Sequence, residues 1–103
     1  MSRKVSIREG SIYLPCSLVE TYFRGIEAVI VLIQQDELMV MPVHQSTSGG
    51  CLLKIRNAAG DRVVQARDVF QDQDLLELSI EGLPVVWRSE KGALCAILPK
   101  NNM

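Results

Sequence analysis

The stretch VSIREGSIYLPCSLVETYF, residues 5–23, predicts the first structural unit of this protein. Apolar and polar residues alternate over residues 5–8 and again over residues 11–14, which is the pattern of a half-buried strand. Glu9-Gly10 lies between the two runs and favours a tight turn, because glycine adopts a positive φ without a steric penalty. Pro15 ends the second run. The stretch therefore predicts a β-hairpin that is followed at once by a different element.

That element is predicted to be a short amphipathic helix. Ser17 and Glu20 have the spacing of a capping box, in which two side chains bond to free backbone N–H groups at the start of a helix. An apolar stripe at helical spacing is formed by Leu18, Val19, Tyr22 and Phe23. Because so short a helix is not stable alone, it must pack against a sheet.

The rest of the first half predicts a second hairpin. Residues 27–33, EAVIVLI, form a near-continuous apolar run, which indicates a strand buried on both faces. Residues 34–37 make a turn, and residues 38–43, LMVMPV, return as a strand with Pro42 near its end at a sheet edge. Residues 44–50, HQSTSGG, are small, polar and glycine-rich, so they are predicted to be a linker.

The same order of elements recurs after the linker. LKIR at residues 53–56 aligns with VSIR at residues 5–8. The remaining elements of the second half are predicted as a turn at 58–61, a strand at 62–65, a helical stripe of Ala66, Val69 and Phe70, an acidic connection at 72–81, and strands at 83–87 and 93–98. We predict a single domain, residues 1–103, with pseudo-repeats at about 3–43 and 51–99. A chance match between two hairpin-rich halves is the alternative.

The first half also carries the sequence pattern of a known family. The residues that match are Gly10, Ile12, Leu14, Pro15, Leu18, Leu38, Val40 and Pro42. This pattern of glycine, alternating strand, Leu-Pro, short helix and a final strand ending near proline resembles the AbrB/MraZ swapped-hairpin family. The resemblance implies a β-rich α+β fold, a small swapped-hairpin β-barrel in which two hairpin–helix–hairpin units interleave. It further implies that one chain supplies both units, as in MraZ-like members, and that the barrel binds DNA.

Composition and charge limit the classes of function. The chain has 103 residues and a net charge of −1, with an isoelectric point of about 5.8, so it lacks the strong non-specific attraction to nucleic acid of a basic domain. The longest apolar run, residues 28–33, is far shorter than the roughly 20 residues that span a bilayer. The first residues lack the apolar region of a signal peptide. We therefore expect no membrane segment.

The reactive residues do not form a catalytic or metal-binding pattern. Cys16, Cys51 and Cys95 are an odd number of widely spaced cysteines, and each has apolar neighbours. They are therefore predicted to be buried, reduced thiols in the cytoplasm. His44 is the only histidine, and its place in the linker favours a solvated residue over a metal or catalytic role. We expect no enzymatic activity, no cofactor and no metal.

Basic residues are the candidate DNA contacts. These are Arg3, Lys4, Arg8, Lys54, Arg56 and Arg62. Lys4 and Arg8 alternate with apolar residues of the first strand, so they are expected to point outward. In the repeat, Arg56 follows Ile55, which is expected to point inward. Two related basic strands could contact phosphates on two sides of a groove, whereas the alternative is that these charges only block aggregation of an exposed strand.

Two functions remain open at this point. The first is a cytoplasmic DNA-binding transcriptional regulator of AbrB/MraZ type. The second is a non-enzymatic protein-interaction or assembly module, including self-association, that keeps the barrel without binding DNA. Ser11 stands where the family often has a basic residue, and Arg24 is the only basic residue of the first helix, which favours the second. A contiguous basic face would indicate DNA, whereas a mixed surface with an exposed apolar patch would indicate a protein partner.

Overall fold

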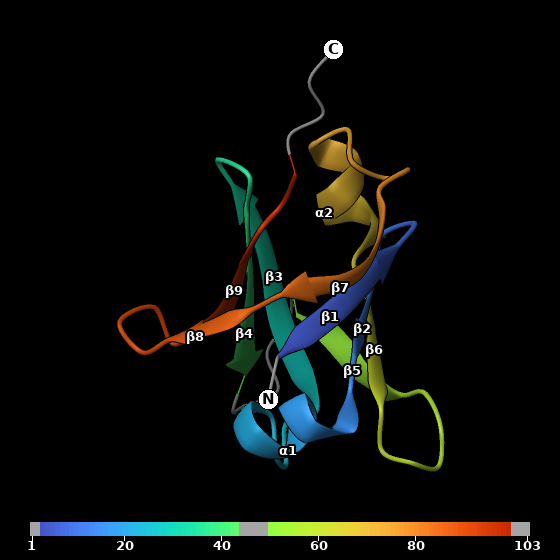
Figure 1. Cartoon of the computed structure of the whole chain (residues 1–103), viewed down its shortest axis with the longest axis vertical. Coiled ribbons are helices and arrows are strands. Elements are labelled where there is room, and N and C mark those ends of the chain that lie inside the picture. The colour runs from blue at the N-terminus through green and yellow to red at the C-terminus, as the bar shows by residue number, and fades with distance from the viewer. Residues whose placement is uncertain (1–2, 44–49, 100–103) are drawn as a thin grey trace.

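The computed structural model describes residues 3–43 and 50–99, which form one antiparallel sheet with two helices (Figure 1). The elements in chain order are β1 (Lys4–Arg8), β2 (Ser11–Leu14), α1 (Cys16–Tyr22), β3 (Ala28–Gln34), β4 (Glu37–Val43), β5 (Cys51–Ile55), β6 (Arg62–Gln65), α2 (Arg67–Asp72), β7 (Ser79–Pro84), β8 (Val86–Arg88) and β9 (Ala93–Ile97). The order of the nine strands in the sheet is β7-β1-β2-β6-β5-β3-β4-β9-β8.

The sheet curls into a nearly closed barrel, because its two end strands are consecutive in the chain. β7 pairs with β1 and β8 pairs with β9, and only Val85 separates β7 from β8. Val85 donates its backbone N–H to the carbonyl of Arg3 at 3.0 Å. The predicted β-rich barrel with two short helices is therefore confirmed in outline.

Aliphatic side chains from both halves of the chain fill the barrel. Several of the most buried are Ile7, Ile12, Leu14, Leu18, Val29, Leu38, Val64 and Leu94. α1 lies at one end of the barrel and α2 at the other (Figure 1). Phe70 of α2 is fully buried, and Phe23 directly after α1 is nearly so. Each short helix is thus stabilised by packing on the sheet, as its length requires.

The start of α1 differs from the prediction. The helix begins at Cys16 after Pro15, and no side chain of the helix caps it, so the predicted Ser17–Glu20 capping box is wrong. The carboxylate of Asp61, in the β5–β6 loop, instead accepts the backbone N–H of Cys16 at 2.8 Å. A residue of the other half of the chain therefore satisfies a free N–H group at this helix end.

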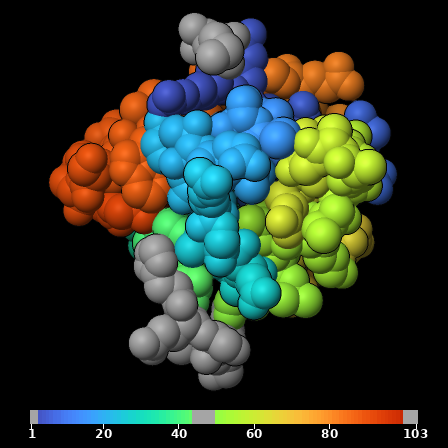
Figure 2. All heavy atoms as spheres, turned by 90° about the horizontal axis from the view of Figure 1, so that it is seen from below, coloured from blue at the N-terminus to red at the C-terminus, as the bar shows by residue number. Residues whose placement is uncertain are grey.

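The same end of the barrel is covered by an aromatic cluster. Tyr22 stacks on Trp87 of β8, with ring centroids 4.9 Å apart, and Phe23 meets Trp87 edge to face at 6.5 Å. Figure 2 shows α1 packed between the β8 region and the β5–β6 loop in the view from below. α1 thus contacts β8 through Tyr22 and the β5–β6 loop through Cys16, so it links these two parts of the barrel.

Two strands depart from the predicted pattern. β3 is buried on one face only: Val29, Val31 and Ile33 are buried, whereas Ile30 and Leu32 are each 39% exposed. The reason is that the barrel wall is a single layer, so no element covers the outer face of β3. The predicted acidic connection at residues 72–81 is also shorter, because β7 already begins at Ser79.

Candidate functional site

The barrel has a seam between β7 and the end of β9. The β8–β9 ladder pairs Arg88 with Ala93 and Val86 with Cys95. In the same register the next pair would be Pro84 with Ile97, but proline has no N–H to donate and the ladder stops. β7 then turns away to pair with β1. A single proline therefore leaves the barrel wall open at this point.

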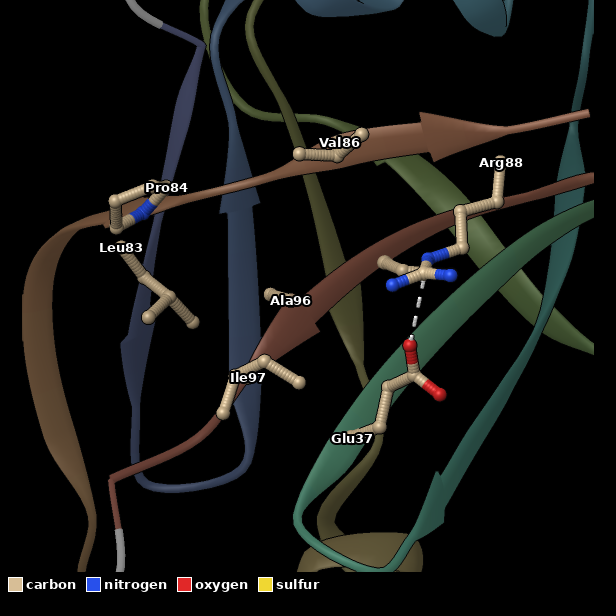
Figure 3. A pocket seen from close by; sticks show the side chains of 8 residues that line it. Glu37, Leu83, Pro84, Val86, Arg88, Ala96 and Ile97 are labelled. Atoms are coloured by element: carbon tan, nitrogen blue, oxygen red, sulfur yellow. Dashed lines mark ion pairs between the residues drawn. The ribbon is translucent and has the colours of Figure 1, made fainter.

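A cavity of about 290 Å³ lies in this seam (Figure 3). Six of its lining residues are apolar or weakly polar: Leu83, Pro84, Val86, Cys95, Ala96 and Ile97. Glu37 of β4 and Arg88 of β8 line the rest of it, and Figure 3 shows Arg88 reaching towards Glu37. The cavity therefore combines an apolar wall with one ionic end.

Four charged side chains form that ionic end. Lys91 Nζ donates to Glu37 Oε1 at 2.8 Å, and Arg88 Nε lies 3.7 Å from Glu37 Oε2. Arg88 Nη1 also lies 3.6 Å from Glu90 Oε2. The hydrogen bond from Lys91 lowers the pKa of Glu37 below its usual value, with smaller contributions from both nearby cations. Glu37 is therefore a stable carboxylate at neutral pH.

The ionic end covers a small buried cluster on the outside of the barrel. Met39, Ala93 and Cys95 alternate with core residues on their strands, so they face outward, yet they are buried. Burial raises the pKa of the Cys95 thiol, and the nearby Glu37 carboxylate adds to this effect. Cys95 is thus buried, as predicted, whereas Cys16 and Cys51 are only partly buried.

Apolar side chains surround the ionic end on the outside of β3, β4, β8 and β9. We call this set the outer apolar face, and it consists of Ile30, Leu32, Met41, Val86 and Ile97. Val86 and Ile97 are the most exposed, at 63% and 65%, and both line the seam cavity. The seam cavity therefore opens within an exposed apolar surface.

The predicted cationic residues of the strands lie mostly on the opposite part of the barrel wall. Lys4 and Arg8 are exposed on β1, and Lys54 is exposed on β5. Arg8 Nη2 lies 3.4 Å from Glu81 Oε1, and Lys54 Nζ donates to Gln65 Oε1 at 3.0 Å. Two of the three therefore have partners from neighbouring strands.

The other three predicted residues lie in separate places. The Arg3 guanidinium lies over the Tyr22 ring at 5.0 Å, and that of Arg56 lies over the Tyr13 ring at 4.7 Å. Arg62 lies on the same face of β6 as the buried Val64. Its Nη1 donates to the carbonyl of Leu53 on β5 at 3.2 Å. The structure does not bring these three side chains into one group.

The prediction that Ile55 points into the core is wrong. Ile55 is 71% exposed, although Leu53 on the same face of β5 is buried. Ile55 pairs with Arg62, two positions beyond the Leu53–Val64 pair that reaches the core. The β5–β6 loop extends away from the barrel here (Figure 1), so no element packs on Ile55.

A second cavity lies between the β1–β2 turn and the segment that follows α2. Its volume is about 520 Å³, and its lining residues are Arg8, Glu9, Arg67, Leu76, Glu77 and Ser79. Arg67 Nη1 donates to the Glu9 carbonyl at 3.4 Å. The lining therefore holds two cations, Arg8 and Arg67, together with two carboxylates, Glu9 and Glu77.

Within residues 3–43 and 50–99, no group of three or more His, Cys, Asp and Glu side chains could hold a metal ion. Neither helix of the described ranges is long and apolar enough to cross a membrane. His44 and most of the predicted linker lie outside the described residues.

Comparisons of the chain with protein-family models, curated proteins and solved structures found no match. The function must therefore be argued from the site itself. Two signals in the sequence could have located that site. The first is Pro84, which interrupts the apolar run LPVVW. The second is the pair Ile30 and Leu32, because a strand with one buried face does not need apolar residues at these alternate positions.

Proposed function

We propose that this protein is a non-enzymatic interaction module that binds another protein through its outer apolar face. The observation that carries the proposal is the exposure of four apolar side chains on the outer side of the consecutive strands β3, β4, β9 and β8, two of which also line the seam cavity. They are Ile30 and Leu32 on β3, and Val86 and Ile97 at the cavity. Exposed apolar residues are common singly, whereas a clustered patch on a small protein is typical of a binding surface. The ionic end supplies the polar groups that such surfaces place beside their apolar centre.

The charge distribution supports a protein partner over DNA as the main function. Arg8 is paired with Glu81, and Arg88 and Lys91 are paired with Glu37. Arg56 and Arg3 lie on aromatic rings rather than beside each other. The described surface is therefore mixed in charge, without the contiguous basic stripe that phosphate binding favours.

We also propose that the barrel is built from two interleaved pseudo-repeats, as the AbrB/MraZ resemblance implies. The support comes from reciprocal pairing: β1 of the first half pairs with β7 of the second, and β5 of the second pairs with β3 of the first. β2 with β6 and β4 with β9 pair across the halves in addition. If each strand of one half is replaced by its counterpart in the other half, the same set of pairs results. In this comparison β7 and β8 together are the counterpart of β3.

A reducing compartment such as the cytoplasm is part of the proposal. Cys16, Cys51 and Cys95 are all unpaired thiols, and Cys51 and Cys95 have pKa values raised by burial. Thiols in this state persist where disulfide formation is suppressed. None of the three takes part in the proposed binding surface as a reactive group.

Quantitative co-purification from native host cells tests the interaction function. The parent protein is compared with Val86→Lys and with the control Leu52→Lys, because both residues are 63% exposed strand residues and only Val86 lines the seam cavity. We expect a partner that is retained by the parent and by Leu52→Lys and lost from folded Val86→Lys. Equal retention by all three proteins would contradict the proposal.

DNA contact is the second candidate, and one observation favours it. The outward residues of β1, β2, β6 and β5 are basic or uncharged, and they are Lys4, Ser6, Arg8, Ser11, Tyr13, Leu52, Lys54, Val63 and Gln65. Fluorescence anisotropy with a mixed DNA pool, at several salt concentrations, tests this. DNA contact predicts weaker binding and a shallower salt dependence for the Arg8→Ala, Arg56→Ala double variant. No binding by the parent at low salt removes this candidate.

A further inference from the structure

The seam cavity has an apolar wall and, at one end, the Arg88 guanidinium beside the Glu37 carboxylate, and we infer that it binds the carboxyl-terminal aliphatic residue of a partner polypeptide. The aliphatic side chain occupies the space between Pro84, Val86 and Ile97, and the terminal carboxylate binds Arg88. This inference rests on the proposed interaction function and specifies the chemistry of the partner.

The size and lining of the cavity fit one aliphatic side chain. Its volume of about 290 Å³ is at the lower limit of the roughly 300–1,000 Å³ of small-molecule sites. Leu83 and Pro84 form one side, and Val86 and Ile97 contribute the exposed rim. The walls away from the ionic end offer no charged side chain, so a branched aliphatic group is the matching occupant.

The polar end is suited to a carboxylate, because Arg88 is less well satisfied than its neighbours. Lys91 already holds Glu37 at 2.8 Å. The two partners of Arg88 within the described residues lie at 3.6 and 3.7 Å, beyond the roughly 2.7–3.2 Å of an N–H···O hydrogen bond. The guanidinium, whose side chain is 46% exposed, therefore retains donors that can bind a planar carboxylate by two parallel hydrogen bonds.

One terminal residue can satisfy both ends at once. In a carboxyl-terminal residue the carboxylate and the side chain are attached to the same Cα, so they lie close enough to occupy adjoining parts of a small cavity. Glu90 is the competitor for Arg88, but its ion pair is long and its side chain is 66% exposed, and such pairs are weak. An incoming carboxylate can therefore replace Glu90 at Arg88.

The direct test is an NMR titration of the full chain with three probes. These are acetyl-Gly-Ile with a free carboxylate, the same dipeptide as its C-terminal amide, and isovalerate as a free acid. We expect the free-carboxylate dipeptide to bind with a dissociation constant of about 0.1–1 mM, as suits a ligand of its size. Backbone amide signals of Val86, Arg88 and Ile97 should shift, and the amide probe should bind at least ~10-fold more weakly.

Three variants assign the contact. Arg88→Gln should weaken binding of the dipeptide by about 10- to 100-fold, since it removes a charged hydrogen-bond pair. Glu90→Gln should strengthen it several-fold by removing the competitor. Arg24→Gln is the control, because Arg24 is an exposed arginine that pairs with Glu20 of α1 and does not line the seam cavity, and binding should not change.

Three results would overturn the inference. Equal binding of the acid and amide dipeptides would remove the role of the carboxylate. Isovalerate binding as tightly as the dipeptide would assign the cavity to a free acid rather than to a polypeptide. No saturable binding of any probe would remove the site, and if Val86→Lys still lost its partner, the proposed interaction function would stand without this inference.

Discussion

A double-mutant cycle on Ile12 and Val64 tests the interleaved core. These residues are directly opposite each other on β2 and β6, and both are fully buried. Ile12→Ala removes the equivalent of three carbon atoms, about 2.4 kcal/mol at roughly 0.8 kcal/mol for each, and the cavity left behind raises the expected loss to about 2–5 kcal/mol. Val64→Ala removes two, for about 1.6 kcal/mol before the cavity is included.

Because the two side chains share one packing site, the losses should not add. We expect an interaction energy of about 0.5–3 kcal/mol between the substitutions, measured from urea unfolding of the parent, the single variants and the double variant. The control pairs Ile12→Ala with Cys95→Ala, since Cys95 belongs to a separate buried cluster outside the barrel. The control should be additive within about 0.5 kcal/mol. Additive losses at Ile12 and Val64 would refute the shared core.

Three further predictions follow from the described contacts. Gly10→Ala should destabilise the protein by about 1–3 kcal/mol in urea unfolding, because Gly10 has φ +83° and an added Cβ would lie 2.8 Å from the Arg67 backbone; an unchanged midpoint would contradict this. Cys95→Ala should cost on the order of 1 kcal/mol in urea unfolding, and an unchanged midpoint would contradict a thiol that packs in the buried cluster with Met39 and Ala93. Thermal unfolding should be constant from neutral pH to about pH 5.5 and should decline between about pH 5 and pH 2, because the pKa values of Glu37 and Asp61 are lowered by hydrogen bonds from Lys91 and Asn57. Groups with a lowered pKa stabilise the folded state only while ionised, so the Glu37→Gln, Asp61→Asn double variant should show a shallower decline than the parent.

The local elements could be predicted because their signals are local. Alternation over residues 5–8 and 11–14, Glu9-Gly10 and Pro15 correspond closely to β1, the turn, β2 and the start of α1. The burial of Leu18 and Phe70 follows from the helical stripes. Each of these depends on side chains within a few positions of one another, which is the range over which sequence periodicity is informative.

The errors came from contacts between distant segments. The sequence predicts a Ser17–Glu20 capping box, which the helix does not form. Nothing nearby in the sequence indicates that Asp61 lies beside the N–H of Cys16. The outward exposure of Ile30 and Leu32 depends on the absence of a second layer over β3, which a hydrophobic run does not reveal. Ile55 follows the alternation of β5 but lies beyond the part of the strand that reaches the core.

The candidate site was missed because its residues come from four strands, and β4 is far in the sequence from β7, β8 and β9. Glu37 meets Arg88 and Lys91 only because β4 and β8 both lie beside β9. The break at Pro84 was visible in the sequence, since proline within a strand marks an edge or an irregularity. The cavity beside Ile97 could not be predicted from this break alone, because its position depends on the register between β8 and β9.

Site-specific photo-crosslinking in native host cells is the most direct test of partner binding through the outer apolar face. A photoreactive phenylalanine analogue replaces Ile97 at the rim of the seam cavity, or Leu52 as an equally exposed apolar residue that does not line it. We expect a discrete protein adduct from position 97 that is absent from position 52 and that is lost when Val86→Lys is added. No adduct at position 97, or the same adducts from both positions, would contradict binding through the outer apolar face.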